Sequence, residues 1–454
     1  MSSEKRTLID NALLLNEGQE REVAILIGKD GRIERVESAG GISPAPTDTA
    51  IDAQGDYLMP GAIDTHVHFR DPGLTHKADM ATESAAAVSG GVTSFLDMPN
   101  TKPLTTNNQA LREKYQYANG RSYANYGFYL GATRRNIEEI EALDPTITPA
   151  VKLFMGSSTG DMAVDQLEAL HSVFSQTPIL LATHCETDDL IRANTQLAKQ
   201  AYPDGDIPYH LHPQIRSAHS CAQSVSLAME LAQQYNTRLH ILHLSCAEEL
   251  DLIAQGKEKR PGYLTAETCP HYLHLSSTSY DQLRWRMKCN PAIKGRMDQL
   301  HLQEALHSGL IDTIGSDHAP HLISEKDRPY ASAPSGMPSI EFSLQLMLDL
   351  ADTIGLPRHH IPRLMAHNPA TIYRIHLRGY VREGYYADLV RVRHLQEPQS
   401  LTQKGIRTKC AWTPYVNHTT RYSVIATWVN GHLAYSPDSP MPSPQGKALR
   451  FNHA

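Results

Sequence analysis

The pattern of apolar and polar residues divides the chain into a long middle region and two similar ends. Between residues 61 and 320, apolar runs of strand length recur eight times, and most are separated by segments with helical periodicity. The runs are GAIDTHVHF, GVTSFLDMP, YANYGFYLGA, PAVKLFMG, PILLATHCE, LHILHLSC, GYLTAETCPHY and DTIGSDHAP; DMATESAAAVSG and CAQSVSLAMELAQQY are examples of the helical segments. Eight alternating strand and helix units predict an α/β fold, a (β/α)8 or TIM barrel.

The two ends of the chain share a β-rich pattern. Residues 5–58 contain short strand-like runs separated by turn sequences such as GKDG and AQGD, and residues 378–435 have the same character. We therefore expect residues 1–58 and 378–454 to form one small β domain, and residues 59–377 to form the barrel. The segment from residue 436 onward is rich in proline and serine, which predicts loose packing.

Composition narrows the function classes. The net charge of −7 gives no sign of a nucleic-acid or anionic-membrane surface. The chain has no apolar run of about 18 residues, and its first residues, MSSEKRTLID, contain no apolar signal segment, so we expect a cytoplasmic protein. The six cysteines lack paired spacing, which is typical of reduced thiols.

Polar residues follow the apolar part of several predicted strands. His66, His68 and Arg70 are spaced two apart, so their side chains project from one face of the first barrel strand. Later strands deliver His184, His243 and Asp317 at similar places. The carboxyl ends of barrel strands are where active sites of this fold lie.

These residue types favour a metal centre. Any one of the histidines is more simply explained as a core residue, but the ordered set is hard to explain that way. Imidazole and carboxylate are zinc ligands, and four histidines with one aspartate are too many for one open zinc site. They suit two metals about 3.5–4 Å apart around a shared hydroxide. Lys152 could bridge two metals only as a neutral, modified amine such as a carbamate, and the residues alone leave open an ordinary lysine at a strand end.

Several motifs carry a family resemblance. HVHFRDPG, DMPNTKP, VKLFMG, THCE, HLS, NPAIK, SDHAPH and HNPATIY resemble, in order, the cyclic-amidohydrolase branch of the amidohydrolase superfamily, and most specifically the dihydroorotases. GYYADLVRV and WVNGHLAY are similar to the closing β strands of that family. The resemblance implies a TIM barrel with a binuclear metal centre and a small composite β-sandwich domain formed by both termini.

The resemblance also assigns metal ligands. It implies two Zn²⁺ ions, the more buried one bound by His66, His68 and Asp317 and the other by His184 and His243, bridged by carbamylated Lys152 and a hydroxide. Some bacterial relatives bridge with an aspartate instead, and Asp161 is the residue to inspect if Lys152 is unmodified. The resemblance also implies a catalytic role for Asp317, which would take the proton of the hydroxide and return it to the leaving nitrogen.

The implied substrate contacts begin with Arg70, whose planar guanidinium suits a bidentate contact with a carboxylate. Asn100 and His321 would bind the same carboxylate, Asn290 would contact the ring, and backbone groups near Gly336 and Pro338 would meet the ring amide. Glu267 and His271, which end the seventh strand, are candidates for support of the pocket.

The function implied is the interconversion of N-carbamoyl-L-aspartate and L-dihydroorotate in pyrimidine (UMP) biosynthesis. The alternatives are a dihydropyrimidinase (hydantoinase) or an allantoinase. Hydantoin-type rings lack the carboxylate, so HVHFRDPG and DMPNTKP favour the dihydroorotate reaction over these alternatives. HPQIRSAHSCAQSV and NPAIK depart from the family pattern and bear on the choice of substrate.

A non-catalytic scaffold is disfavoured because the implied ligands are all retained. The resemblance further implies a homodimer and allows association with aspartate transcarbamoylase.

Overall fold

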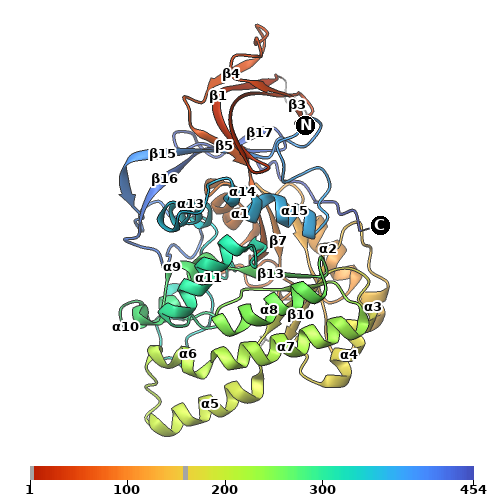
Figure 1. Ribbon diagram of the computed structural model, residues 1–454, viewed down its shortest axis with the longest axis vertical. Helices are drawn as coiled ribbons and strands as arrows, with labels where there is room; N and C mark the ends of the chain where they lie inside the picture. The colour runs from red at the N-terminus through yellow and green to blue at the C-terminus, as the bar shows by residue number, and fades with distance from the viewer. Residues whose placement is uncertain (1–4, 157–161, 454) are drawn as a thin grey trace.

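The computed structural model describes residues 5–156 and 162–453. A barrel surrounded by helices makes up the lower part of the molecule in Figure 1, and a β domain lies at its top. No helix in the described ranges is long and apolar enough to cross a membrane.

The barrel strands coincide with the eight predicted apolar runs. Their bounds are β6 (Ala62–Val67), β7 (Val92–Asp97), β8 (Asn125–Phe128), β9 (Leu130–Gly131), β10 (Val151–Met155), β11 (Leu181–Cys185), β12 (Leu239–Ile241), β13 (Leu264–Thr268) and β14 (Thr313–Ile314). The third run supplies both β8 and β9. Neighbouring strands pair in parallel and in chain order. A parallel bridge between Val67 and His318 joins the last run to the first, so the predicted barrel is confirmed.

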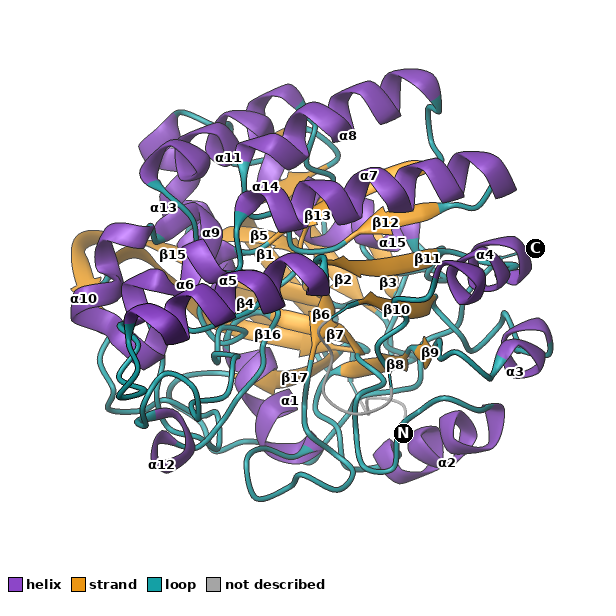
Figure 2. Cartoon of the chain, turned by 90° about the horizontal axis from the view of Figure 1, so that it is seen from below, coloured by secondary structure: helices purple, strands orange, loops and turns teal. Residues whose placement is uncertain are grey.

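Helices surround these strands, as the view from below shows (Figure 2). The first, α1 (Met80–Ser89), begins at Asp79, whose side chain accepts a hydrogen bond from the Thr82 backbone N–H. The other α-helices are α2 (Asn108–Ala118), α3 (Ile137–Glu141), α4 (Leu167–Gln176), α5 (Asp188–Ala201), α6 (His212–Ile215), α7 (Ala218–Tyr235), α8 (Ala247–Lys259), α9 (Pro270–His274), α10 (Tyr280–Leu283), α11 (Arg296–Ser308), α12 (Ile323–Lys326), α13 (Ser343–Ile354), α14 (His360–Pro362) and α15 (Asn368–Ile372). Short 3₁₀ or π turns are η1 (Tyr209–Leu211), η2 (Ser277–Ser279), η3 (Arg284–Met287) and η4 (Arg363–His367).

The β domain is built from both ends of the chain. Its strands are β1 (Thr7–Asn16), β2 (Gln19–Ile27), β3 (Ile33–Ser38), β4 (Thr49–Asp52), β5 (Tyr57–Pro60), β15 (Leu389–Ser400), β16 (Thr419–Val429) and β17 (His432–Tyr435). They form one hydrogen-bonded sheet in which β5 pairs with β15, and this pairing joins the two ends. The tight β1–β2 turn places Glu17 and Gly18 at positive φ, as the favoured hairpin turn requires.

Two segments assigned by sequence to the β domain lie against the barrel instead. The connection between β15 and β16 reaches the barrel, where the Trp412 indole N–H donates to the His321 carbonyl. The tail was expected to be loosely packed; none of residues 436–448 is buried, but two residues that follow them are. Leu449 and Phe451 are buried in one cluster with apolar residues of the first barrel strands, and Ala448 forms a parallel bridge with Tyr126 of β8.

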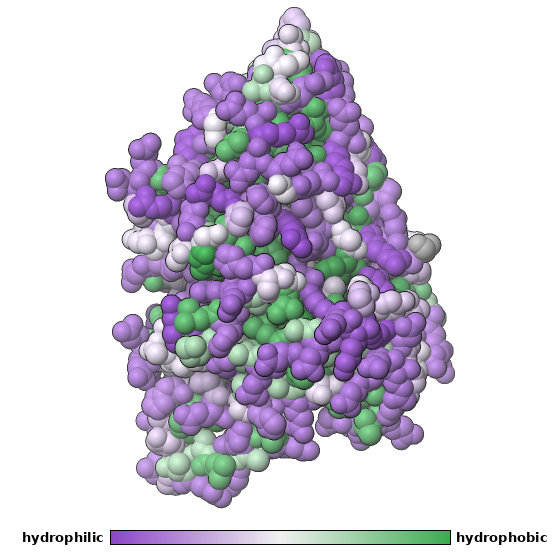
Figure 3. Space-filling model, in the orientation of Figure 1, coloured by the Kyte–Doolittle hydropathy of each residue, from purple (hydrophilic) through white to green (hydrophobic). Residues whose placement is uncertain are grey.

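The face of the molecule seen in Figure 3 is mostly hydrophilic, with apolar residues gathered in small patches between the helices. All six cysteines are free and buried, which confirms the prediction of reduced thiols.

Candidate metal and substrate site

The predicted site residues meet in one cavity of about 220 Å³ at the carboxyl ends of the barrel strands. Those that line it are His66, His68, Arg70, Asn100, Lys152, His184, His243, Asn290, Asp317, His321 and Gly336. Phe154, Ala319, Pro334 and Ser335 complete the wall. These side chains lie together because all the barrel strands run in the same direction and end at the same rim.

One group of metal-ligand atoms belongs to His66, His68 and Asp317, which lie within 4.8 Å of one another. Asp317 Oδ1 is 3.2 Å from His66 Nε2 and 3.1 Å from His68 Nε2. The eighth run closes the barrel onto the first, and this brings Asp317 to the two histidines. Gly315 lies just before it, where a Cβ would collide with the Glu267 carboxylate at 2.4 Å.

Hydrogen bonds on the far side of each ring orient these histidines. Glu267 Oε1 is 2.7 Å from His66 Nδ1, and Asn100 Oδ1 is 2.7 Å from His68 Nδ1. Both oxygens are acceptors, so both Nδ1 atoms are protonated and both Nε2 atoms present lone pairs toward Asp317. Burial acts to raise the pKa of Asp317, but the neighbouring His66, His68 and His243 lower it overall, so its carboxylate is ionised.

His184 and His243 form a second group. Nδ1 of His184 lies 2.9 Å from Nε2 of His243, and both residues are buried. On its other side, His184 Nε2 is 3.0 Å from Glu186 Oε2, and Glu186 in turn pairs with Arg216. Burial lowers the pKa of both histidines, which favours the neutral form that ligates metals. The His66 and His243 rings, 5.2 Å apart, place the two groups side by side.

Lys152 lies on β10 at the floor of the same cavity. It is fully buried, and its Nζ has no hydrogen-bond partner among the described residues. Burial lowers its pKa to about 7, so a large fraction of the amine is neutral at physiological pH. An unpaired, readily neutral amine beside the histidines and Asp317 fits a lysine that is modified to a bridging carboxylate. Asp161, the alternative bridge, lies outside the described residues.

The backbone at this rim is conformationally strained. Arg70, His243 and Asp317 all have positive φ values, of 64°, 42° and 45°. Each such conformation costs a non-glycine residue about 1–3 kcal/mol and tends to occur at functional sites. The fold therefore stabilises strained conformations at three of the predicted site residues.

Arg70 marks the other end of the cavity. Its Nε donates to the Pro320 carbonyl at 3.1 Å, and its Nη2 lies 3.0 Å from His321 Nε2. Burial lowers the pKa of Arg70 to about 10, which leaves it cationic at neutral pH. Within the described residues, no carboxylate forms an ion pair with it. A buried cation without an ion-pair partner, facing a cavity, is suited to an anionic ligand.

The sequence matches the Amidohydrolase family over residues 57–434. The chain belongs to the amidohydrolase family. This confirms the resemblance drawn from the motifs. The dihydroorotase of Methanosphaera stadtmanae is 32% identical over 415 residues, covering 91% of this chain and 94% of that protein. The dihydroorotase of Methanosarcina acetivorans is 33% identical over 419 residues, covering 90% of this chain and 87% of that protein.

Other members of the amidohydrolase family are also similar. The allantoinase of Deinococcus radiodurans is 29% identical over 412 residues, covering 89% of this chain and 90% of that protein. Among solved structures, the L-hydantoinase (dihydropyrimidinase) from Arthrobacter aurescens superposes with a TM-score of 0.91 at 25% identity, covering 99% of this chain and all of that one. The amidohydrolase barrel is therefore shared by proteins whose names refer to different ring substrates.

The structure corrects one detail of the expected amidohydrolase site. Pro338 does not line the cavity; it lies with His318 and Trp412 around a separate small hollow. Met337 bridges to His318, and this pairing carries the chain beside the eighth run and away from the cavity. Gly336 does reach the cavity, although its N–H already donates to the Lys288 carbonyl at 2.9 Å.

Sequence reasoning missed several supporting residues. Glu186, two residues after His184 and just past the end of β11, could have been found from the same spacing of two that singled out His66 and His68. Lys288 and Lys326 had no such signal. Lys288 Nζ donates to the carbonyls of Tyr330 and Ala333, both at 2.6 Å, and Lys326 Nζ donates to those of Lys288 and Pro334, both at 2.9 Å. These two buried ammonium groups hold in place the segment that forms the Pro334–Gly336 wall.

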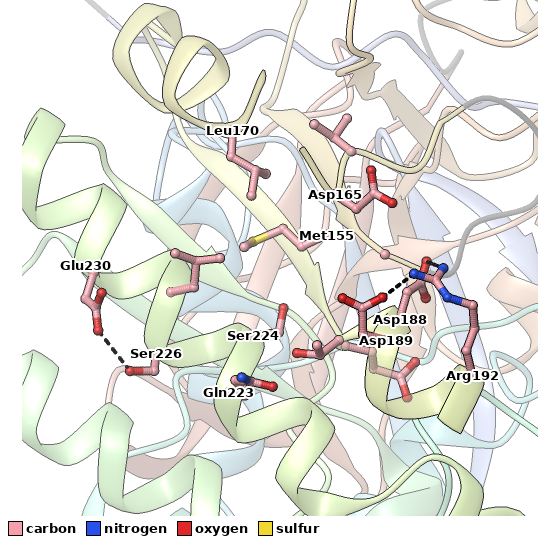
Figure 4. Close-up of a pocket in the computed structure, with 15 residues that line it drawn as sticks. Met155, Asp165, Leu170, Asp188, Asp189, Arg192, Gln223, Ser224, Ser226 and Glu230 are labelled. Atoms are coloured by element: carbon pink, nitrogen blue, oxygen red, sulfur yellow. Dashed lines mark hydrogen bonds and ion pairs between the residues drawn. The ribbon is translucent and has the colours of Figure 1, made fainter. Parts of the chain in front are cut away.

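A second, wider cavity of about 420 Å³ lies beside β10 and β11, between α4, α5 and α7 (Figure 4). In this cavity Arg192 pairs with Asp189, and the Ser226 hydroxyl donates to the Glu230 carboxylate. No histidine or lysine is among the described residues that line it.

Proposed function

We propose that this chain is a dihydroorotase, a hydrolase that interconverts N-carbamoyl-L-aspartate and L-dihydroorotate in pyrimidine biosynthesis. The single observation that carries the proposal is the position of Arg70. Its buried, unpaired guanidinium opens on the same cavity as the histidine and aspartate cluster. Dihydroorotate needs both features, because it has an amide to hydrolyse and a free carboxylate to bind.

The proposed cofactors are two Zn²⁺ ions held by the two ligand groups, His66, His68 and Asp317 on one side and His184 and His243 on the other, with carbamylated Lys152 between them. The donor types are those that zinc accepts. The chemistry that the bound metals supply is polarisation of the amide carbonyl and activation of a water molecule.

Asp317 moves the proton in the proposed reaction. Its ionised carboxylate faces the cavity and is ready to accept a proton from the attacking water. As the C–N bond of the ring breaks, Asp317 donates that proton to the leaving nitrogen. In ring closure the same carboxylate takes the proton from the ureido nitrogen. One group thus serves as base and then as acid in either direction.

The remaining residues of the cavity hold the substrate. Arg70 binds the carboxylate, with Asn100 and His321 beside it. The Asn100 side-chain oxygen is occupied by His68, so its NH₂ group is the part left to donate. Asn290, whose Oδ1 has no partner among the described residues, is placed to contact the ring together with the backbone at Gly336.

The test compares initial rates of ring opening of zinc-loaded protein on dihydroorotate and dihydrouracil at equal concentration. We expect turnover of dihydroorotate and no measurable turnover of dihydrouracil. Arg70→Met should raise KM for dihydroorotate about 100-fold or more, since the carboxylate would lose a buried, charged partner. Preference for dihydrouracil would overturn the proposal and leave a metal-dependent amide hydrolase of the hydantoinase type.

A second candidate is an allantoinase or hydantoinase, favoured by the similarity to the Deinococcus radiodurans allantoinase and the Arthrobacter aurescens L-hydantoinase. Neither allantoin nor hydantoin carries a carboxylate, so neither accounts for the unpaired Arg70. Adding both rings to the same assay distinguishes the candidates. Metal analysis of the purified protein addresses a non-catalytic scaffold, for which little or no bound zinc is expected.

Location and assembly complete the proposal. We place the enzyme in the cytoplasm as a homodimer, and an association with aspartate transcarbamoylase would join the enzyme to the supplier of carbamoyl aspartate. Size measurement of the protein alone and mixed with that partner tests both associations.

A further inference from the structure

A lysine that no motif identified lies behind His321, at the end of the cavity where Arg70 is found. Lys77 Nζ lies 3.0 Å from His321 Nδ1 and 3.3 Å from Glu325 Oε1. Only 14% of its side chain is exposed. Two successive turns keep it close to Arg70, because the Leu74 N–H donates to the Arg70 carbonyl and the Lys77 N–H donates to the Leu74 carbonyl.

The contact with Lys77 decides which nitrogen of His321 carries the proton. An ammonium group has only donors, so His321 Nδ1 must accept and the ring proton must lie on Nε2. That Nε2–H can donate to the Ser335 carbonyl at 3.0 Å. Burial acts to lower the pKa of Lys77, and the Glu325 carboxylate opposes this by favouring the ammonium. Burial and the charges of Arg70, Lys77 and Lys326 lower the pKa of His321, so the ring is neutral.

The position of this proton affects Arg70. Its Nη2 lies 3.0 Å from His321 Nε2, and with the proton on Nε2 both nitrogens are donors that cannot satisfy each other. A substrate oxygen placed between them from the cavity would accept from Arg70 and share the His321 Nε2–H with the Ser335 carbonyl. In the other tautomer, Nε2 would accept from Arg70 and occupy the donor that a substrate carboxylate needs.

We propose that Lys77 is a positioning residue for the substrate carboxylate: it holds His321 as the Nε2–H tautomer and so keeps Arg70 and His321 as a pair of converging donors. The inference deepens the proposed function and rests on its assignment of the carboxylate to Arg70. Without the ammonium, Glu325 Oε2, 3.8 Å from His321 Nδ1, becomes the natural acceptor for a proton on Nδ1. The ring would then change tautomer and pair with Arg70.

The experiment uses Lys77→Met, with Lys77→Ala measured in parallel and Lys77→Arg as the conservative variant. Lys102→Met is the matched control, because Lys102 is an exposed lysine whose charge also acts on Lys77. Nitrogen-15 NMR of histidine-labelled, ligand-free protein reports the His321 tautomer, and the signal that His321→Gln removes gives its assignment. Steady-state kinetics on dihydroorotate follow with the same proteins, zinc-loaded.

We expect wild type, Lys77→Arg and Lys102→Met to show the Nε2–H tautomer, and Lys77→Met and Lys77→Ala to show Nδ1–H. KM should rise about tenfold in the last two, the change expected for one charge-assisted hydrogen bond, while kcat changes less than about threefold. An unchanged tautomer, or a changed tautomer with unchanged KM, would overturn the proposal. Because the NMR needs no substrate, failure of the wild type to turn over dihydroorotate would count against the proposed function alone.

Discussion

Three of the histidines that line the cavity owe their orientation to partners on the far side of the ring. Glu267 holds His66, Asn100 holds His68 and Glu186 holds His184. Such partners fix the tautomer and the direction of the free lone pair, so they act on metal affinity without touching the metal. The proposed function therefore depends on residues one layer away from the ligands.

Glu267→Gln tests this dependence. The amide can still accept from His66 Nδ1, but it brings no charge, so zinc affinity should fall about 10- to 100-fold. Titration of the metal-free protein with zinc and a competing chelator measures the change. The exposed Glu248 on α8 gives the control Glu248→Gln, which should bind zinc as the wild type does. Equal affinity in both variants would contradict an orienting role for Glu267.

At the scale of elements, the β15–β16 connection links the small β domain to the barrel rim that carries the candidate site. Besides the Trp412–His321 bond, the Arg407 backbone N–H donates to the Glu341 carboxylate and the Lys409 N–H donates to Glu83. Through this connection, the β domain contacts the end of the cavity where Arg70 and His321 lie.

Trp412→Phe removes the indole N–H while keeping an aromatic ring against Trp285. The His321 carbonyl would lose its buried donor, so the free energy of unfolding should fall by about 1–3 kcal/mol. We also expect KM for dihydroorotate to rise, since His321 would be less well held. Urea unfolding and steady-state kinetics measure the two effects. Trp428→Phe, in the β-domain core, is the control and should leave KM unchanged.

Glu341 makes stability depend on pH. Burial, helped by the charge of Glu83, raises its pKa from 4.5 to about 7. Between pH 4.5 and pH 7, the folded state therefore keeps a proton on Glu341 that the unfolded state releases. The stability that comes from this proton is fully present below pH 4.5 and is lost as the pH rises through 7. Glu341→Gln cannot ionise, so it should be more stable than wild type at pH 8, by about 1–3 kcal/mol, and similar at pH 5.

Urea unfolding at pH 5 and pH 8 measures this difference. The exposed Glu304 supplies the control Glu304→Gln, for which the same small change is expected at both pH values. A Glu341→Gln variant with a pH-independent effect would show that Glu341 titrates normally.

At the scale of the whole molecule, the last residues of the chain act as part of the barrel. The Leu449 N–H donates to the Tyr126 carbonyl, and the Phe451 N–H donates to that of Thr146. The tail crosses from the β domain to the barrel and runs beside β8. It therefore stabilises the barrel at a distance from the cavity.

Phe451→Ala should lower the free energy of unfolding by about 3–5 kcal/mol, the usual cost of removing a buried phenylalanine side chain. Activity per folded molecule at low temperature should remain that of wild type. Calorimetry of this variant beside Asn452→Ala, whose side chain is exposed, measures the effect. A loss below about 1 kcal/mol would mean that the tail contributes little.

The sequence by itself determined the barrel, the composite β domain and the main residues of the cavity. Strand alternation is a local property, so the spacing of His66 and His68 predicts a shared face without any knowledge of the rest of the chain. Arg70 lies three residues past the end of β6 at positive φ, so it reaches the cavity through a turn and not by alternation. Parallel strands in a closed barrel bring their carboxyl ends to one rim, so His184, His243 and Asp317 follow from their places at strand ends.

Only the tertiary structure decided how residues from different loops meet. Lys77 and Glu325 contact His321 from separate segments, Pro338 turns away from the cavity because Met337 pairs with His318, and Phe451 is buried although its segment is rich in proline and serine. Periodicity carries no information about such contacts, since they depend on the paths that loops take across the surface. The tautomer of His321 depends on one of these contacts, so it too is a product of the fold.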